Sequence, residues 1–182
     1  MDISIFGLGY VGVVSVGCLA NEGHTVIGVD PIQTKVALIN EGKTPIIEKD
    51  IGELIKKSVD AGRLRATTHA DEAVKNTEMS VVCVGTPSQL NGSLDLRYVR
   101  KVCEEIGASL KLKSGFHVVV VRSTMLPGSM RKMVIPVLED SSGKKAGESF
   151  GVCNNPEFLR EGTAVYDFYN PPKTVIGETD SR

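Results

Sequence analysis

The residues best suited to chemistry stand near the start of the chain, where positions 7–12 read GLGYVG. This GxGxxG pattern directly follows an apolar run at positions 3–6 and opens a helical stretch. In such a turn Gly7 allows the tight bend, Gly9 lets the backbone approach a pyrophosphate, and Gly12 lets the helix pack closely on the strand. The free N–H groups and the positive end of the helix then attract phosphates. The pattern therefore predicts a dinucleotide site.

An acidic residue, Asp30, ends the second apolar run, about 20 residues after the glycine-rich turn. At this offset a carboxylate accepts hydrogen bonds from the ribose hydroxyls. A carboxylate accepts hydrogen bonds from the 2′-OH of NAD but repels the 2′-phosphate of NADP, so NAD is the expected cofactor. Lys35 lies one helical turn further on, and two interpretations stay open: a contact on the ribose side, or a solvated lysine. The alternative for the whole pattern is a structural turn followed by a solvated acid.

Two threonines follow later strands at their carboxyl ends. Thr86 lies in CVGTPS at 83–88, and Thr124 lies in RST at 122–124. In a doubly wound sheet, ligands bind beyond the carboxyl ends of the strands. We therefore expect Thr86 to offer its hydroxyl or backbone to the cofactor and Thr124 to stand near the nicotinamide end. A simple Gly-Thr-Pro turn is an equally good interpretation of the first segment.

Two glutamates, Glu157 and Glu161, stand in NPEFLREG at 155–162. On a helix this spacing would put both on one face. They would then serve in proton transfer, or simply be first-turn carboxylates that the helix dipole favours.

Short apolar strands alternate with helical stretches along almost the whole chain. The expected strands are 3–6, 25–29, 64–67, 80–84, 116–121 and 174–176. The expected helices are 10–21, a stretch around 36–39, 51–61 with Gly62 as its C-terminal glycine, and 96–110, while 140–148 is expected to be a loop. This order predicts an α/β fold, a Rossmann-type doubly wound, mostly parallel sheet with helices on both faces.

Composition excludes several kinds of partner. The 182 residues carry 21 Lys and Arg against 22 Asp and Glu, and Trp is absent, so nucleic acid is not an expected partner. No apolar run approaches the ~20 residues of a spanning helix, and no secretory signal precedes the first strand, so we expect no membrane and a cytoplasmic location. The four cysteines are scattered without ligand spacing, so neither a disulfide framework nor a metal site is expected.

Taken together, these segments resemble the nucleotide-sugar 6-dehydrogenase family. The matching segments are FGLGYVG at 6–12, IGVD at 27–30, CVGTPS at 83–88, VVRSTMLPG at 120–128 and NPEFLREG at 155–162. Softer similarities to the GDP-mannose branch are NGSLDL at 91–96, SGKKAG at 142–147 and PPKTVIGE at 171–178.

The resemblance implies an NAD-dependent oxidoreductase of polysaccharide biosynthesis, such as alginate biosynthesis, that oxidises a sugar C6 alcohol to a carboxylate in two hydride transfers. Its substrate would be GDP-mannose, giving GDP-mannuronate, or alternatively UDP-glucose. Glu161 would contact the sugar nucleotide or help the water that releases the acid, and Glu157 would support the same loop. The residues that would contact NAD are Tyr10, Val11, Asp30, Lys35, Thr86 and Thr124.

The family's nucleophilic cysteine lies in a GGxCxxKD motif that these residues do not contain. Residues 1–182 are therefore expected to be the NAD-binding N-terminal portion of a longer enzyme, without its central helix and its nucleotide-sugar domain. The longer protein is expected to be a homo-oligomer and this portion a monomer without activity of its own. A stand-alone NAD-binding module and another NAD enzyme, such as a hydroxy-acid dehydrogenase, are the alternatives.

Overall fold

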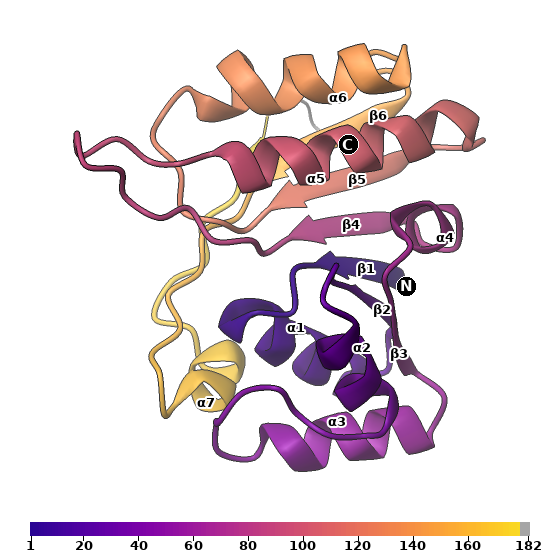
Figure 1. Ribbon diagram of the computed structural model, residues 1–182, viewed down its shortest axis with the longest axis vertical. Helices are drawn as coiled ribbons and strands as arrows, with labels where there is room; N and C mark the ends of the chain where they lie inside the picture. The colour runs from indigo at the N-terminus through magenta and orange to yellow at the C-terminus, as the bar shows by residue number, and fades with distance from the viewer. Residues whose placement is uncertain (179–182) are drawn as a thin grey trace.

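The computed structural model describes residues 1–178; residues 179–182, which include the end of the chain at Asp180–Arg182, lie outside the described part. A seven-stranded sheet with the order β3-β2-β1-β4-β5-β6-β7 forms the centre of the molecule (Figure 1). The strands are β1 Asp2–Phe6, β2 Thr25–Val29, β3 Leu64–Thr67, β4 Met79–Val82, β5 His117–Val121, β6 Phe150–Asn154 and β7 Gly177–Glu178. The helices are α1 Tyr10–Asn21, α2 Gln33–Asn40, α3 Ile51–Asp60, α4 Ala70–Lys75, α5 Arg97–Leu112, the π-helix η1 Met130–Val134, α6 Ile135–Ser142 and α7 Ala164–Tyr169.

The sheet reverses its winding direction at β1. This strand pairs in parallel with β2 on one side and with β4 on the other, so that Ile3 is in register with both Val26 and Met79. Within the described residues every strand pair is parallel except β6 with β7. The carboxyl ends of β1 and β4 thus meet at a topological switch point, which is where such sheets bind ligands.

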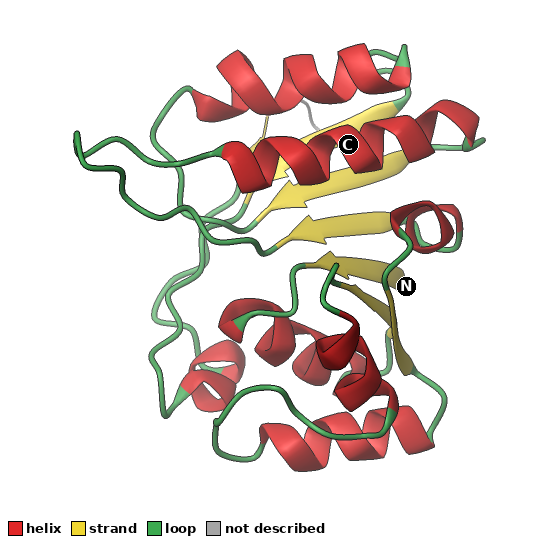
Figure 2. Ribbon diagram, viewed as in Figure 1, coloured by secondary structure: helices red, strands yellow, loops and turns green. Residues whose placement is uncertain are grey.

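Helices cover both faces of the sheet (Figure 2). Because neighbouring side chains on a strand point to opposite faces, Ile3 and Ile5 of β1 enter a core with α1, α2 and α3. Phe6 enters a second core with α4, α5 and α6. The predicted fold class, a doubly wound Rossmann-type sheet, is confirmed.

Helix α7 lies far from the strands that flank it in sequence. A long connection leaves β6 and places α7 beside α1 (Figure 1). Ala164 is fully buried there against Val14 and Cys18 of α1. This contact brings the segment after β6 next to the start of the first helix.

Several boundaries differ from the prediction, and the strand β6 and the helices α4, η1, α6 and α7 were not predicted. The prediction of a strand at 174–176 is wrong, because the strand in this region, β7, begins only at Gly177. The carbonyl oxygen of Val175 instead accepts a hydrogen bond from the side chain of Asn155. The loop expected at 140–148 is also partly wrong, since α6 continues to Ser142 and ends at Gly143, which has a φ of 68°. Strand β4 ends at Val82, so Cys83 and Val84 already belong to the loop beyond it.

Within residues 1–178, no helix has both the length and the apolar character needed to cross a membrane.

Candidate dinucleotide-binding site

A cleft of about 1130 Å³ opens at the carboxyl ends of β1, β2 and β4. This exceeds the ~300–1,000 Å³ of most small-ligand pockets and therefore suits an extended ligand. The sequence-predicted residues that line it are Gly7, Gly9, Asp30, Lys35 and Thr86. The opposite wall comes from the start of α4 and from α5, with His69, Asp71, Tyr98, Lys101, Val102 and Glu105.

The glycine-rich turn leaves room for a ligand at only one of its three glycines. Gly7 has a φ of 96°, which side chains rarely adopt, and a Cβ there would lie 2.9 Å from a methyl group of Val84. At Gly12 a Cβ would lie 1.8 Å from the carbonyl oxygen of Gly7, so this glycine is required for close packing of α1 on the turn. A Cβ at Gly9 would meet nothing within 4 Å. The space beside Gly9 fits the predicted approach of a pyrophosphate.

Asp30 lies at the end of β2 and binds the turn itself. Its Oδ2 accepts a hydrogen bond from the backbone N–H of Leu8 at 2.8 Å, and its Oδ1 accepts one from Ile32 at 2.9 Å. The residue is 4% exposed. Because a carboxylate has about four acceptor positions, it can still accept a hydrogen bond from a ribose hydroxyl.

Lys35 pairs with Asp30, its Nζ lying 3.3 Å from Oδ2. The side chain is 30% exposed and lines the cleft, and its pairing with Asp30 shows that it is not a free surface lysine.

Tyr10 and Val11 contribute differently from the residues above. Neither side chain lines the cleft, since Tyr10 points toward Glu48 and Val11 packs against the core of α1. They form the backbone of the first turn of α1, which begins at Tyr10, and the free N–H groups of such a turn can bind a phosphate.

The two predicted threonines are brought together. The Thr86 hydroxyl donates a hydrogen bond to the carbonyl oxygen of Thr124 at 2.8 Å. Nearby, the Ser123 hydroxyl donates to the carbonyl oxygen of Val84 at 2.5 Å. These bonds join the loops that follow β4 and β5. Thr86 lines the cleft, whereas Thr124 supports Thr86 from outside the lining.

The segment that carries Glu157 and Glu161 is a loop, so the expectation that they share a helix face is wrong. Residues 155–163 contain no helix, and α7 begins only at Ala164. Glu157 is half-buried, and its Oε2 accepts a hydrogen bond from the N–H of Leu159 at 2.6 Å. Glu161 is exposed. Carboxylates from outside the segment hold its backbone instead: Asp167 accepts a hydrogen bond from the Arg160 N–H, and Glu48 accepts one from the Gly162 N–H.

A smaller cavity of about 140 Å³ adjoins this loop. Glu157 and Arg122 both line it. The Arg122 guanidinium donates to Asn155 Oδ1 at 2.6 Å and lies over the ring of Phe168. Asp167 and Lys173 line the cavity as well, so its walls carry both acidic and basic side chains.

The cysteines present no activated thiol. Burial raises the pKa of Cys18, Cys83 and Cys103 to about 12, and burial also raises the pKa of Cys153. Since the thiolate is the nucleophile, these four residues are unsuited to attack a carbonyl. In the part of the chain that the structure describes, no group of three or more His, Cys, Asp or Glu side chains could hold a metal ion.

Two features of the site had no signal in the sequence. The wall formed by His69 and Tyr98 lies outside every motif, and so does Glu48, which binds Tyr10 and the loop before α7. Glu48 reaches its backbone partners across 114 and 116 residues of sequence, so no local pattern could have identified it.

Comparison with known proteins agrees with this geometry. A sequence model of the UDP-glucose/GDP-mannose dehydrogenase family, NAD binding domain, matches residues 1–182. The chain is 58% identical to the GDP-mannose 6-dehydrogenase of Azotobacter vinelandii, over 99% of this chain and 41% of that protein. It is 40% identical to a UDP-glucose 6-dehydrogenase of Haloferax volcanii, over 100% of this chain and 42% of that protein.

A solved structure is similar throughout. The GDP-mannose dehydrogenase of Pseudomonas aeruginosa, solved as a ternary complex, superimposes with a TM-score of 0.97 at 57% identity, covering 99% of this chain and 41% of that one. The chain thus spans about two fifths of the length of the curated relatives it matches. It belongs to the UDP-glucose/GDP-mannose dehydrogenase family, whose NAD-binding domain it comprises.

Proposed function

We propose that residues 1–182 form the NAD-binding portion of a longer nucleotide-sugar 6-dehydrogenase that oxidises GDP-mannose to GDP-mannuronate. The observation that carries the proposal is Asp30, which holds the glycine-rich turn through Leu8 and faces the cleft at the end of β2. The choice of GDP-mannose rests on relatives named GDP-mannose 6-dehydrogenase that are 56% to 58% identical, against 40% for the UDP-glucose enzyme.

The described residues fit NAD in three places. The open space at Gly9 and the first turn of α1 suit the pyrophosphate. Asp30 and Lys35 suit the adenosine ribose. Thr86, with Thr124 behind it, suits the nicotinamide side. When bound, NAD supplies the hydride acceptor for an alcohol carbon.

The loop at 155–163 is proposed to meet the sugar nucleotide. Glu161 is exposed, and it would contact the substrate or orient the water that releases the acid. Glu157 would hold the loop in shape, as its bond to the Leu159 N–H indicates. The nucleophilic cysteine would come from outside residues 1–182, because burial raises the pKa of the cysteines described above.

The remaining parts of the proposal continue the expectations drawn from the sequence. The enzyme would work in the cytoplasm in the synthesis of a uronic-acid polysaccharide such as alginate, with no nucleic-acid or membrane partner. The longer protein would be a homo-oligomer, and residues 1–182 alone would be a monomer.

Two measurements test the proposal. Calorimetry with the 182-residue chain should show binding of NAD in preference to NADP. NADH absorbance with GDP-mannose or UDP-glucose should stay at background for this chain and rise steadily with GDP-mannose for the product of the whole reading frame. Positioning contributes about 7–11 kcal/mol to such reactions, so an incomplete substrate cleft should not support turnover. Steady NADH production by residues 1–182 would refute the assignment of the cysteines.

A further inference from the structure

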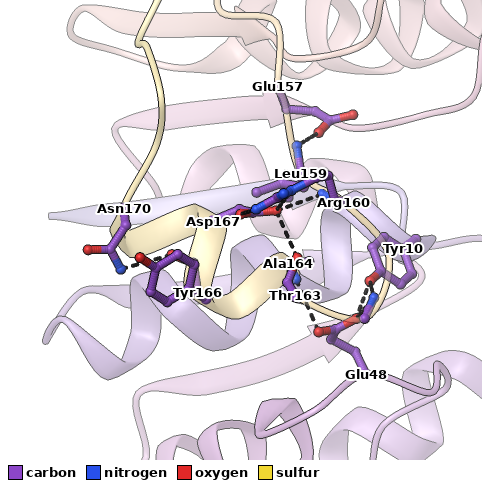
Figure 3. A network of polar contacts seen from close by, with 11 residues as sticks. Tyr10, Glu48, Glu157, Leu159, Arg160, Thr163, Ala164, Tyr166, Asp167 and Asn170 are labelled. Atoms are coloured by element: carbon purple, nitrogen blue, oxygen red, sulfur yellow. Dashed lines mark hydrogen bonds and ion pairs between the residues drawn. The ribbon is translucent and has the colours of Figure 1, made fainter.

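Glu48 joins two parts of the site that are distant in sequence. Its Oε2 accepts hydrogen bonds from the Tyr10 hydroxyl and from the Gly162 N–H, the latter at 2.7 Å. Its Oε1 accepts one from the Ala164 N–H at 3.1 Å. The Gly162 N–H also lies 3.1 Å from the Tyr10 hydroxyl oxygen. Figure 3 shows Tyr10 and Ala164 beside the Glu48 carboxylate. We call Glu48, Tyr10, Gly162 and Ala164 the clasp.

The ionisation states of the clasp agree with its geometry. Desolvation alone would raise the pKa of Glu48, but the hydrogen bonds from Tyr10, Gly162 and Ala164 lower it on balance. Desolvation and the bond to Glu48 raise the pKa of Tyr10 to about 12, and the charge of Glu161 contributes in the same direction. At neutral pH a protonated phenol therefore donates to an ionised carboxylate.

The clasp fixes one side of Glu161, and a second anchor fixes the other. The preceding residue, Arg160, donates from its backbone N–H to Asp167 Oδ2 at 3.0 Å and from its guanidinium to Asp167 Oδ1 at 2.6 Å. The hydrogen bond from this guanidinium lowers the pKa of Asp167 to about 2. Glu161 thus stands between two residues whose backbone N–H groups each donate a hydrogen bond to a carboxylate.

At its other end the clasp reaches the dinucleotide site. Tyr10 is the first residue of α1, directly after Gly9, where we place the pyrophosphate. A ligand held by the first turn of α1 restricts the backbone that carries the Tyr10 side chain. That side chain in turn contacts the carboxylate that holds Gly162.

We propose that Glu48 is a positioning residue that couples occupation of the dinucleotide site to the conformation of the loop bearing Glu161. The inference rests on the proposed binding of NAD at the glycine-rich turn. Coupling between two sites is reciprocal, so NAD should stabilise the loop by as much as an ordered loop strengthens NAD binding.

Amide hydrogen exchange of Gly162 and Ala164, with and without saturating NAD, tests the coupling. Calorimetry establishes saturation separately for each variant. In the unmutated chain NAD should slow exchange at both amides, by about tenfold. In Glu48→Gln both amides should exchange faster without NAD, and NAD should no longer slow them. In Tyr10→Phe the bonds from Glu48 to the loop remain, so protection without NAD should persist while the response to NAD is lost.

The matched control is Glu53→Gln, which neutralises an exposed acid in the first turn of α3 and should keep the full response to NAD. A merely structural Glu48 would change exchange without NAD but leave the response to NAD intact. An unchanged response in Glu48→Gln and in Tyr10→Phe would therefore overturn the inference, as would NAD binding to the unmutated chain without any slowing. Failure of the unmutated chain to bind NAD would instead overturn the proposed function.

Discussion

Asp30 has two tasks at the residue scale, since it holds the glycine-rich turn and faces the cleft. Its oxygens accept hydrogen bonds from the backbone N–H groups of Leu8 and Ile32, and Lys35 forms an ion pair with it. Replacing it should therefore change the shape of the glycine-rich turn as well as remove the proposed contact with ribose.

Asp30→Ala should weaken NAD binding by about tenfold to a hundredfold, the effect of losing a hydrogen bond to a charged group. Because the variant no longer repels a 2′-phosphate, the difference between NAD and NADP should also narrow. Titration calorimetry with both cofactors measures the two effects. Glu41→Ala, which removes an exposed acid after α2, is the control and should change neither. Equal affinity of the unmutated chain for NAD and NADP would contradict the role of Asp30.

Gly9→Val should abolish NAD binding and leave the domain folded. The backbone of Gly9 has a φ of −84°, which valine adopts without strain, and a Cβ meets no neighbour within 4 Å. The side chain would instead fill the space proposed for the pyrophosphate. The matched variant Gly12→Val should fail to fold, because its Cβ would lie 1.8 Å from the Gly7 oxygen. Circular dichroism and calorimetry separate these outcomes, and normal NAD binding by Gly9→Val would place the phosphate site elsewhere.

At the element scale, a buried polar chain crosses β1, β4 and β5. The Ser4 and Ser80 hydroxyls lie 2.8 Å apart, and Ser80 lies 2.8 Å from Nε2 of His117. His117 is fully buried. Burial and the nearby charge of Lys113 lower its pKa from 6.5 to about 4.

The fold should therefore lose stability as the pH falls from 6.5 toward 4. Across this window the unfolded chain binds a proton at His117 that the folded chain does not, so acid favours unfolding. The lowered pKa corresponds to about 3 kcal/mol at the acid end of the window. Urea unfolding at several pH values should show this extra loss in the unmutated chain and not in His117→Gln. Identical pH profiles for the two proteins would show that folding does not lower the pKa of His117.

The central elements could be predicted because their signals are local. Apolar runs such as 118–121 and the glycine-rich turn identify parallel strands and the first βα turn without tertiary information. Helix α1 is apolar nearly all round, which indicates a helix buried on more than one side. The sheet covers one side, and α7 covers another through Ala164.

The rest depended on distant contacts. The spacing of Glu157 and Glu161 is compatible with a helix, but the Asp167 and Glu48 carboxylates bind the backbone of this segment and hold it as a loop. The apolar run at 174–176 suggests a strand, but the Asn155 side chain donates a hydrogen bond to the Val175 carbonyl oxygen. In both cases a side chain outside the segment determines the backbone.

At the scale of the whole molecule, α7 closes the structure against its first helix. Besides the burial of Ala164, the Tyr169 hydroxyl donates to the Cys18 carbonyl oxygen at 3.4 Å and accepts from Asn21 at 3.0 Å. These contacts join residues 148 and 151 positions apart, and the clasp joins residues up to 152 apart. Strand β1, by contrast, pairs with β2, which is the next strand in the sequence.

Contacts of such long sequence separation are expected to form after the sheet, because the intervening chain must first be ordered. Glu48→Ala should therefore speed unfolding and leave the folding rate nearly unchanged, as for any interaction absent from the transition state. Stopped-flow folding and unfolding in urea measure the two rates. Slower folding of the variant would instead place the clasp in the folding nucleus.

This closure by α7 also has a consequence during translation. The ribosome adds about 5–20 residues per second, so α1 emerges on the order of ten seconds before α7. Throughout that interval the side of α1 that carries Val14 and Cys18 lacks the helix that buries it in the finished protein. A nascent chain stalled before Ala164 therefore exposes an apolar helix face, which makes this stage of synthesis the one at which chaperone binding and aggregation compete with folding.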